Sequence, residues 1–153
     1  MESSVVARNR KARHDYFIIE TVEAGMVLTG TEIKSVRSGK INLKDGYAKV
    51  QGSEVWLYNV HISPFEQGTY YNHEPLRPRK LLLHKREIRK LYGKTREKGL
   101  ALVPLRLYFK NGMVKVEIGV GKGKKMHDRR EDIKQREERR SIARDFKSKR
   151  IKV

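Results

Sequence analysis

The sequence lacks cysteine, and it is short of acidic residues and of long apolar runs. Without cysteine there are no disulfides, thiolate metal sites or cysteine nucleophiles, and a reducing compartment is permitted. No stretch approaches the ~18 consecutive apolar residues of a membrane-spanning helix, and residues 1–16 lack the apolar segment of a signal peptide. We therefore expect a cytoplasmic protein.

The shortage of acidic residues is the most informative one. Against 18 Asp and Glu there are 36 Lys and Arg, which gives a net charge of +18. Self-repulsion makes such an imbalance costly for a compact fold, and a polyanionic partner, most often nucleic acid, usually explains it. A membrane-surface helix would need an apolar face that the chain does not offer. The charge therefore favours a nucleic-acid-binding protein.

Apolar periodicity in the first half of the chain predicts short strands around one helix. Residues 1–13 form a polar, basic arm, and Gly25 reads as a turn between two early strands. Residues 29–40 have a helical spacing, for which Thr31 is the expected cap. Strands are expected over residues 16–21, 26–28, 45–50 and 54–60.

The second half contains a loop, a further helix and a hairpin. Residues 63–78 hold three of the four prolines and read as a loop, and a helix is expected after residue 83 with Gly93 weakening its end. Asn111 and Gly112 are the pair that a type I′ turn favours, and they separate two alternating apolar segments, residues 105–110 and 113–120. This is the clearest local prediction.

The order of elements predicts a mainly β protein with a basic extension. About six short strands with flanking helices suggest an OB-like closed β-barrel in residues 1–120. Residues 121–153 carry 14 Lys or Arg and 6 Asp or Glu. We expect this tail to be mostly disordered when free and helical on a partner, because few of its residues can be buried. The alternative is a solvated charge run that only keeps the protein soluble.

No constellation of catalytic or metal-binding residues is legible in the sequence. The segment GVGKGKK lacks the glycine spacing and the Ser or Thr of a phosphate-binding loop. We expect no catalytic residue, metal, cofactor or small-molecule substrate. The histidines lie scattered without ligand spacing, at His14, His61, His73, His84 and His127. Rings beside cations suit stacking on unpaired bases; these rings are Tyr16, Phe17, Tyr92 and His127. An aromatic residue of the body is more often a core residue than a stacking platform, whereas His127 has no core among its neighbours.

Four longer stretches carry a resemblance to a known family. They are NRKARHDYFI, VEAGMVLTGTEIKSVRSGKINLKDGYA, HEPLRPRKLLLHKREI and GVGKGKKMHDRREDIKQRE, of which TGTEIKSVR together with RPRKLLL is the most specific combination. On these stretches the sequence is identified as a member of the SsrA-binding protein family, also called small protein B. The resemblance implies an OB-type barrel that binds the tRNA-like domain of transfer-messenger RNA. It also implies delivery of that RNA to stalled ribosomes in trans-translation, where the nascent peptide is tagged for degradation.

The resemblance also implies which residues of the body contact RNA. The matching positions are Asn9, Lys11, His14, Tyr16, Glu23 and Leu82. A carboxylate repels phosphate, so Glu23 would accept from base or ribose donors or orient a neighbouring cation; otherwise it is a surface turn residue. Leu82 is either a core residue or an apolar platform for an unstacked base.

In the family the basic tail enters the decoding centre and the empty mRNA channel, among small-subunit rRNA. With the RNA it completes a mimic of tRNA. The matching tail positions are Gly123, Lys124, Lys125, His127, Asp128, Arg129 and Arg130. Arg129 stands where the family more often has lysine, so a planar fork replaces a point charge.

Two other kinds of protein would share parts of this pattern. A ribosomal or translation-factor OB protein that binds rRNA alone would explain the charge, the barrel and the tail, but not the specific stretches. An RNA-modifying or RNA-cleaving enzyme would need a histidine pair or a carboxylate–metal cluster, and none is legible.

Overall fold

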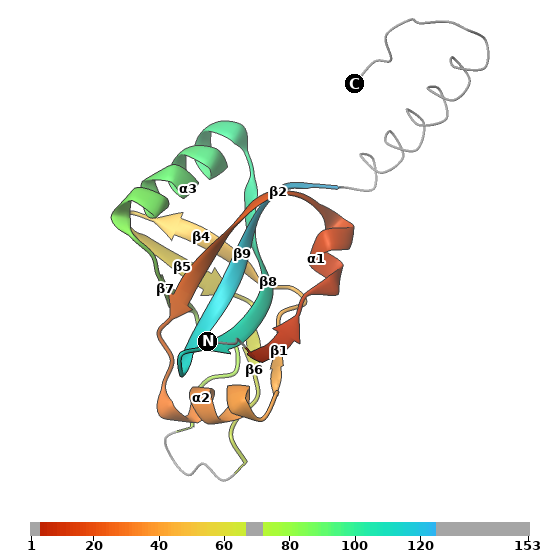
Figure 1. The fold of residues 1–153 in the computed structure, drawn as a ribbon, viewed down its shortest axis with the longest axis vertical. Helices are drawn as coiled ribbons and strands as arrows, with labels where there is room; N and C mark the ends of the chain where they lie inside the picture. The colour runs from red at the N-terminus through yellow and green to blue at the C-terminus, as the bar shows by residue number, and fades with distance from the viewer. Residues whose placement is uncertain (1–3, 67–71, 125–153) are drawn as a thin grey trace, which may run out of the picture. The chain divides into compact units, whose positions relative to one another are not determined.

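The computed structural model describes residues 4–66 and 72–124, and the elements of this part are coloured along the chain in Figure 1. It is mainly β, as the sequence predicts. The strands are β1 (Ser4–Arg8), β2 (Tyr16–Met26), β3 (Ile41–Asn42), β4 (Tyr47–Gln51), β5 (Glu54–Tyr58), β6 (His61–Ile62), β7 (Arg79–Leu82), β8 (Ala101–Lys110) and β9 (Met113–Gly123). The helices are α1 (Arg10–Asp15), α2 (Gly30–Arg37) and α3 (Lys85–Lys98).

Seven strands form one sheet in the order β1-β8-β4-β5-β7-β2-β9, and β9 also pairs with β8. All of these pairings are antiparallel. The β8–β9 hairpin turns at Asn111 and Gly112, whose φ angles of 53° and 75° are the positive values that the predicted turn requires. Strands β3 and β6 form a separate two-stranded sheet.

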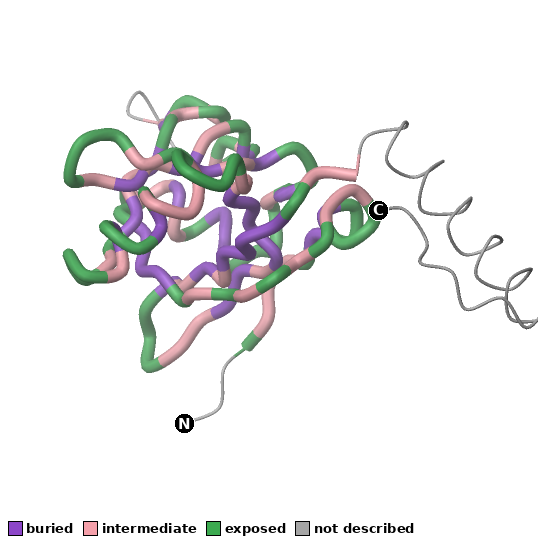
Figure 2. Tube along the Cα trace, turned by 90° about the horizontal axis from the view of Figure 1, so that it is seen from above, coloured by how far each residue is buried: buried purple, intermediate pink, exposed green. Residues whose placement is uncertain are grey.

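The core lies inside the sheet and beneath the helices. Buried segments gather in the interior of the view in Figure 2, and exposed segments follow the outer turns. Val36 of α2 and Ile88 and Leu91 of α3 pack into the same apolar cluster as the inward side chains of the strands. Each helix therefore contributes one apolar side to a core that the sheet supplies.

The N-terminal residues are more ordered than the polar arm that we expected. Ser4–Arg8 form strand β1, which pairs with β8 between Ser4 and Phe109 and between Arg8 and Arg106. Helix α1 follows directly. The open edge of β8 and the apolar residues of SVVAR account for this difference, because the segment adds a strand by backbone hydrogen bonding while Val6 and Ala7 pack against the core.

Two further expectations were wrong in detail. The early strands are one strand, β2, which pairs along its length with β9 (Figure 1), and Gly25 lies within it rather than in a turn. Helix α2 begins after Thr29, not Thr31: the Thr29 hydroxyl accepts from the backbone N–H of Glu32, whose carboxylate accepts from the backbone N–H of Thr29 at 2.8 Å. This reciprocal capping box fixes the start of the helix.

Candidate nucleic-acid interface

Asn9, the residue before α1, forms hydrogen bonds to three separate parts of the chain. Asn9 is buried, and its side-chain oxygen accepts from the backbone N–H of Ala12 at 3.1 Å. Its Nδ2 donates to the carbonyl oxygens of Leu43 at 3.0 Å and Pro104 at 2.9 Å. Asn9 therefore has an internal bonding role that the sequence did not predict, since its three partners lie far apart along the chain.

Lys11 and His14 lie on the exposed side of α1. Lys11 Nζ is 3.1 Å from Asp45 Oδ1, and this hydrogen-bonded ion pair raises the pKa of Lys11. His14 Nδ1 is 3.1 Å from Asp15 Oδ1. An ion pair between exposed side chains contributes little stability, so a phosphate can compete with Asp45 for Lys11 at little cost.

Tyr16 is the first residue of β2, and its side chain is partly packed and partly exposed. It packs against the small buried cluster of Ala12, Val103 and Leu105, and it also borders a hollow of about 480 Å³ that Tyr47 and Tyr92 share. Tyr16 is thus part of a small core on one side and part of an aromatic surface on the other, which combines the two roles that the sequence left open.

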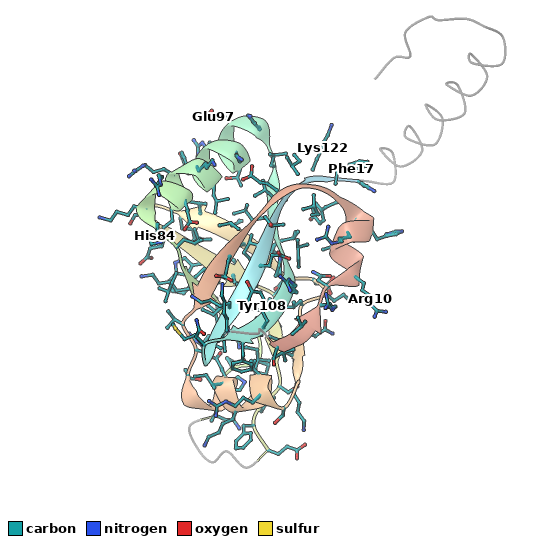
Figure 3. All side chains as sticks on the ribbon, in the orientation of Figure 1. Arg10, Phe17, His84, Glu97, Tyr108 and Lys122 are labelled. Atoms are coloured by element: carbon teal, nitrogen blue, oxygen red, sulfur yellow. The ribbon has the colours of Figure 1, made fainter. Side chains whose placement is uncertain are left out.

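Four arginines that the sequence reasoning did not single out surround Asn9. Together with Glu117 they border a hollow of about 190 Å³, and Arg106 donates from Nε to Glu117 Oε1 at 3.2 Å. The close spacing of three of these arginines along the chain was an available signal. Guanidinium groups are suited to bidentate contact with phosphate. The four are Arg8, Arg10, Arg13 and Arg106; Figure 3 labels Arg10 beside α1.

Glu23 is held by two side chains of β8. Its Oε1 accepts from the Tyr108 hydroxyl at 2.5 Å, and Lys110 Nζ lies 3.4 Å from the same oxygen. The Tyr108 hydroxyl, more than any other group, lowers the pKa of Glu23, while burial and the neighbouring Glu23 raise the pKa of Tyr108. The geometry places a cation, Lys110, where Glu23 can orient it. Figure 3 shows Tyr108 among the central strands.

Leu82 is an exposed residue of β7 rather than a core residue, with 49% of its surface accessible. It lies over Gly25 so closely that a Cβ at that glycine would be 3.3 Å from the Leu82 Cβ. Leu82, Glu23 and Lys115 border one hollow of about 440 Å³. The structure therefore brings Glu23 and Leu82 together, and adds a cation that sequence reasoning missed.

The predicted contact residues of the body form two groups near the ends of β2. Four lie on or beside α1, and two lie around the hollow near Gly25. From Tyr16 to Glu23 the strand extends roughly 23 Å at ~3.3 Å per residue. A surface of this length suits a folded RNA segment better than a single nucleotide.

Strand β9 continues to Gly123, which pairs with Tyr16, so the first three residues of the predicted tail, 121–123, lie within the sheet. A Cβ at Gly121 would be 2.9 Å from the carbonyl oxygen of Phe17, so the close approach of β2 and β9 requires glycine there. Lys124 ends the described residues. Five predicted tail residues lie outside them: Lys125, His127, Asp128, Arg129 and Arg130.

Two searches of the described residues bear on other kinds of site. Within residues 4–66 and 72–124, no group of three or more His, Asp or Glu side chains is placed to hold a metal ion. In the same residues, no helix has the length and apolar content needed to cross a membrane.

The chain is similar to known proteins over most of its length. A model of the SmpB protein family matches residues 6–148. An SsrA-binding protein of Geobacillus thermodenitrificans is 64% identical over 148 residues, which are 97% of this chain and 96% of the relative. One from Desulforudis audaxviator is 63% identical over 94% of both chains, and one from Enterococcus faecalis is 60% identical over 97% of both.

A solved structure shares the fold. It is described as "tmRNA-SmpB: a journey to the center of the bacterial ribosome", and it matches this chain with a TM-score of 0.67 at 51% identity, over 80% of this chain and 86% of that one. The family match spans well over half of the sequence, and the named relatives are 60–64% identical to it across nearly its whole length. This chain belongs to the SmpB protein family.

Proposed function

We propose that this protein binds the tRNA-like domain of transfer-messenger RNA, delivers that RNA to stalled ribosomes and enables tagging of the nascent peptide in trans-translation. The similarity to SsrA-binding proteins at 60–64% identity carries the proposal. The matching solved structure, whose description names tmRNA, SmpB and the bacterial ribosome, supports it independently. The work is done in the cytoplasm, where ribosomes are found.

The body is an OB-like closed β-barrel. The pairings lead from β8 through β4, β5, β7, β2 and β9 and back to β8, a circuit of six strands. Strand β1 pairs with β8 on the same edge as β4, farther along the strand. The β4–β8 pairing consists of one residue pair, Ala48 with Leu102, so closure is narrow at that point. Such barrels commonly bind nucleic acid on one outer face.

The two groups of residues at the ends of β2 contact the RNA in different ways. The exposed side of α1, with Lys11, His14 and the arginines around Asn9, contacts phosphates. Asn9 acts by holding α1 in place rather than by touching a base. At the other end Leu82 offers an apolar platform to an unstacked base, and Glu23 orients Lys110 and accepts from donors of the RNA.

The part of the predicted basic tail, residues 121–153, that follows the end of β9 acts on the ribosome. The 14 Lys and Arg of residues 121–153 suit a channel lined by rRNA phosphates, which can order a helix that has no core of its own. The tail occupies the decoding centre and the mRNA channel when message is absent, with Lys124, Lys125 and His127 near its start. No chemical step is assigned to this chain.

A titration tests the RNA-binding part. The full chain is mixed with the labelled tRNA-like domain at two salt concentrations, with excess ordinary tRNA as competitor. We expect tight binding, with ordinary tRNA a poor competitor. The reason is that the surfaces at both ends of β2 fit the folded RNA, in addition to attracting its phosphates. Full competition by ordinary tRNA or by rRNA fragments would instead favour the alternative, a ribosomal or translation-factor protein that recognises rRNA only.

A further inference from the structure

A groove separates α3 from the turn between β4 and β5. It encloses about 810 Å³, and on the helix side it is bordered by Lys85, Arg89, Tyr92 and Arg96. These residues follow one another at spacings of four, three and four, so they lie along one side of α3. They span about 16 Å at 1.5 Å per residue. None of them is among the predicted contact residues of the tRNA-like domain.

The groove continues toward the predicted interface. The hollow that contains Tyr16 also contains Tyr92 and Arg96, together with Tyr47 and Lys49. Tyr92 and Arg96 therefore border both hollows, and the two form one path from the start of α3 to the start of β2. In Figure 3 nitrogen-tipped side chains project from α3 between the labelled His84 and Glu97.

The positive charge of α3 favours an anionic ligand. The helix carries seven Lys and Arg against two Glu. Lys94 is paired with Glu20, but among the described residues neither Lys85 nor Arg89 has an ion-pair partner. The chain's own tail is a poor occupant, because its charge has the same sign as that of the groove.

Tyr92 supplies the second half of a nucleic-acid site. Tyr92 is 45% exposed, and the Arg96 guanidinium lies 5.9 Å from the centroid of its ring. A ring and a planar cation side by side form a surface on which an unpaired base stacks. A paired base offers no free face, so the ligand is single-stranded.

Gly93 is a third feature that packing inside the protein does not explain. It lies within α3, where glycine is unfavourable relative to alanine. A Cβ there would meet nothing within 4 Å beyond the two adjacent residues and the backbone of its own helix. Glycine is used where a ligand approaches the backbone closely, and Gly93 directly follows Tyr92.

We propose that this groove binds a single-stranded stretch of RNA, with one base stacked on Tyr92 and phosphates held by Lys85, Arg89 and Arg96. The proposal rests on the proposed function only in that the ligand is RNA, and it adds a site that the tRNA-like domain does not require. The groove adjoins the predicted contact surface at Tyr16, which borders the hollow that Tyr92 and Arg96 share.

The test measures binding of the full chain to a labelled oligouridylate of about eight nucleotides, a length within the usual site size of single-strand-binding proteins. The salt concentration is about 0.2 M, which suppresses binding by charge alone. Tyr92→Ala should weaken binding by about tenfold, and Tyr92→Phe should leave it within twofold, because stacking needs only the ring. Gly93→Ala should raise resistance to urea yet weaken RNA binding, whereas a merely structural glycine would change stability alone.

A charge-matched pair separates the groove from the rest of the helix. Replacing both Lys85 and Arg89 by Gln should reduce the slope of log affinity against log salt by about 1.4 for a single strand. Replacing Lys90 and Lys98 by Gln removes the same charge outside the groove and should reduce it much less. Equal effects from both pairs would overturn the proposal.

Two further results would also overturn it. One is oligouridylate binding that neither Tyr92→Ala nor Gly93→Ala changes. The other is an oligoglutamate peptide that binds as tightly and is equally sensitive to Tyr92→Ala, which would indicate an acidic protein partner. Binding of the unaltered chain to the tRNA-like domain is measured in parallel, so that failure of the groove is distinguished from failure of the proposed function.

Discussion

Arg79 donates from Nε to Glu32 Oε2 at 2.7 Å, and both side chains are completely buried. The two residues are 47 positions apart and join α2 to β7. Arg79 also donates to the carbonyl oxygen of Val60 at 2.6 Å, and Arg77 reaches the other oxygen of Glu32 at 2.6 Å. A buried ion pair is stable only when its remaining hydrogen-bonding capacity is satisfied, and this one satisfies it.

Replacing Glu32 by Gln should destabilise the body strongly. Arg79 would be left buried without its counter-charge, which typically costs about 3–5 kcal/mol of unfolding free energy. Urea denaturation followed by circular dichroism measures the loss. Lys40→Gln, which removes the exposed Lys40–Glu66 pair, is the matched control and should cost less than about 1 kcal/mol. Equal effects of the two changes would contradict the structural role of the buried pair.

The same cluster predicts a dependence of stability on pH. Burial tends to raise the pKa of Glu32, but hydrogen bonds from Arg77, the Thr29 backbone and Arg79 outweigh it and lower the pKa to about 2 from an ordinary 4.5. A carboxyl with a depressed pKa stabilises the fold fully above its unfolded pKa and less as pH falls toward its folded pKa. We therefore expect unfolding free energy to fall between about pH 5 and pH 2. Glu32→Gln should flatten this fall, and an unchanged profile would refute the assignment.

Replacing Asn9 by Ala should weaken RNA binding through loss of structure. The carbonyls of Leu43 and Pro104 would lose the Asn9 amide as donor, and that of Leu43 would keep its bond from the Gly46 backbone N–H. The expected loss of unfolding free energy is about 1–3 kcal/mol. Thermal and urea denaturation measure this directly. Asn9→Asp keeps the size and the cap of α1 but supplies no donor, so it should be at least as destabilising. If Asn9→Ala left stability unchanged and still abolished RNA affinity, Asn9 would contact RNA directly.

Replacing Tyr108 by Phe should change the pKa of Glu23 while leaving the Glu23 side chain in place. The Tyr108 hydroxyl is the chief cause of the lowered pKa of Glu23, so its loss should raise that pKa toward the ordinary value of 4.5. Carboxyl carbon titration by NMR reads this shift. Because Glu23 then retains only Lys110, RNA binding should become more sensitive to mild acid. A Glu23 pKa that does not move would mean that the hydrogen bond to Tyr108 is not formed in solution.

The point of truncation decides whether the body survives loss of the tail. Gly121, Lys122 and Gly123 pair with Ile18, Phe17 and Tyr16, so a chain cut after residue 120 should unfold at lower urea concentration than one cut after Lys124. The longer body should keep most of the RNA affinity. If both bodies were equally stable, the end of β9 would not contribute to the sheet.

Local signals predicted some elements well. Asn111 and Gly112 specify their hairpin because the positive φ angles are a property of the two residues themselves. The start of α2 is also predictable, since Thr29 and Glu32 have the spacing of a capping box. The expectation that Thr31 caps this helix is wrong. Gly25 was misread as a turn, because glycine also occurs in strands where another side chain, here Leu82, approaches closely.

Long-range contacts account for what could not be predicted. The placement of β1 depends on the edge of β8, about a hundred residues away, and nothing in SVVAR specifies that partner. The resemblance suggested Glu23 and Leu82 as separate contact residues, and strand pairing brings them together with Tyr108, Lys110 and Lys115. The internal bonds of Asn9 are hidden for the same reason.

The most direct measurement is tagging in a reconstituted translation system that contains ribosomes stalled on a message without a stop codon, alanyl-charged transfer-messenger RNA and this protein. The account predicts that the full chain supports addition of the tag, and that residues 1–124 bind the RNA with similar affinity but give almost no tag. Failure of the full chain to support tagging would contradict the proposed function. Efficient tagging by residues 1–124 would contradict the role given to the tail.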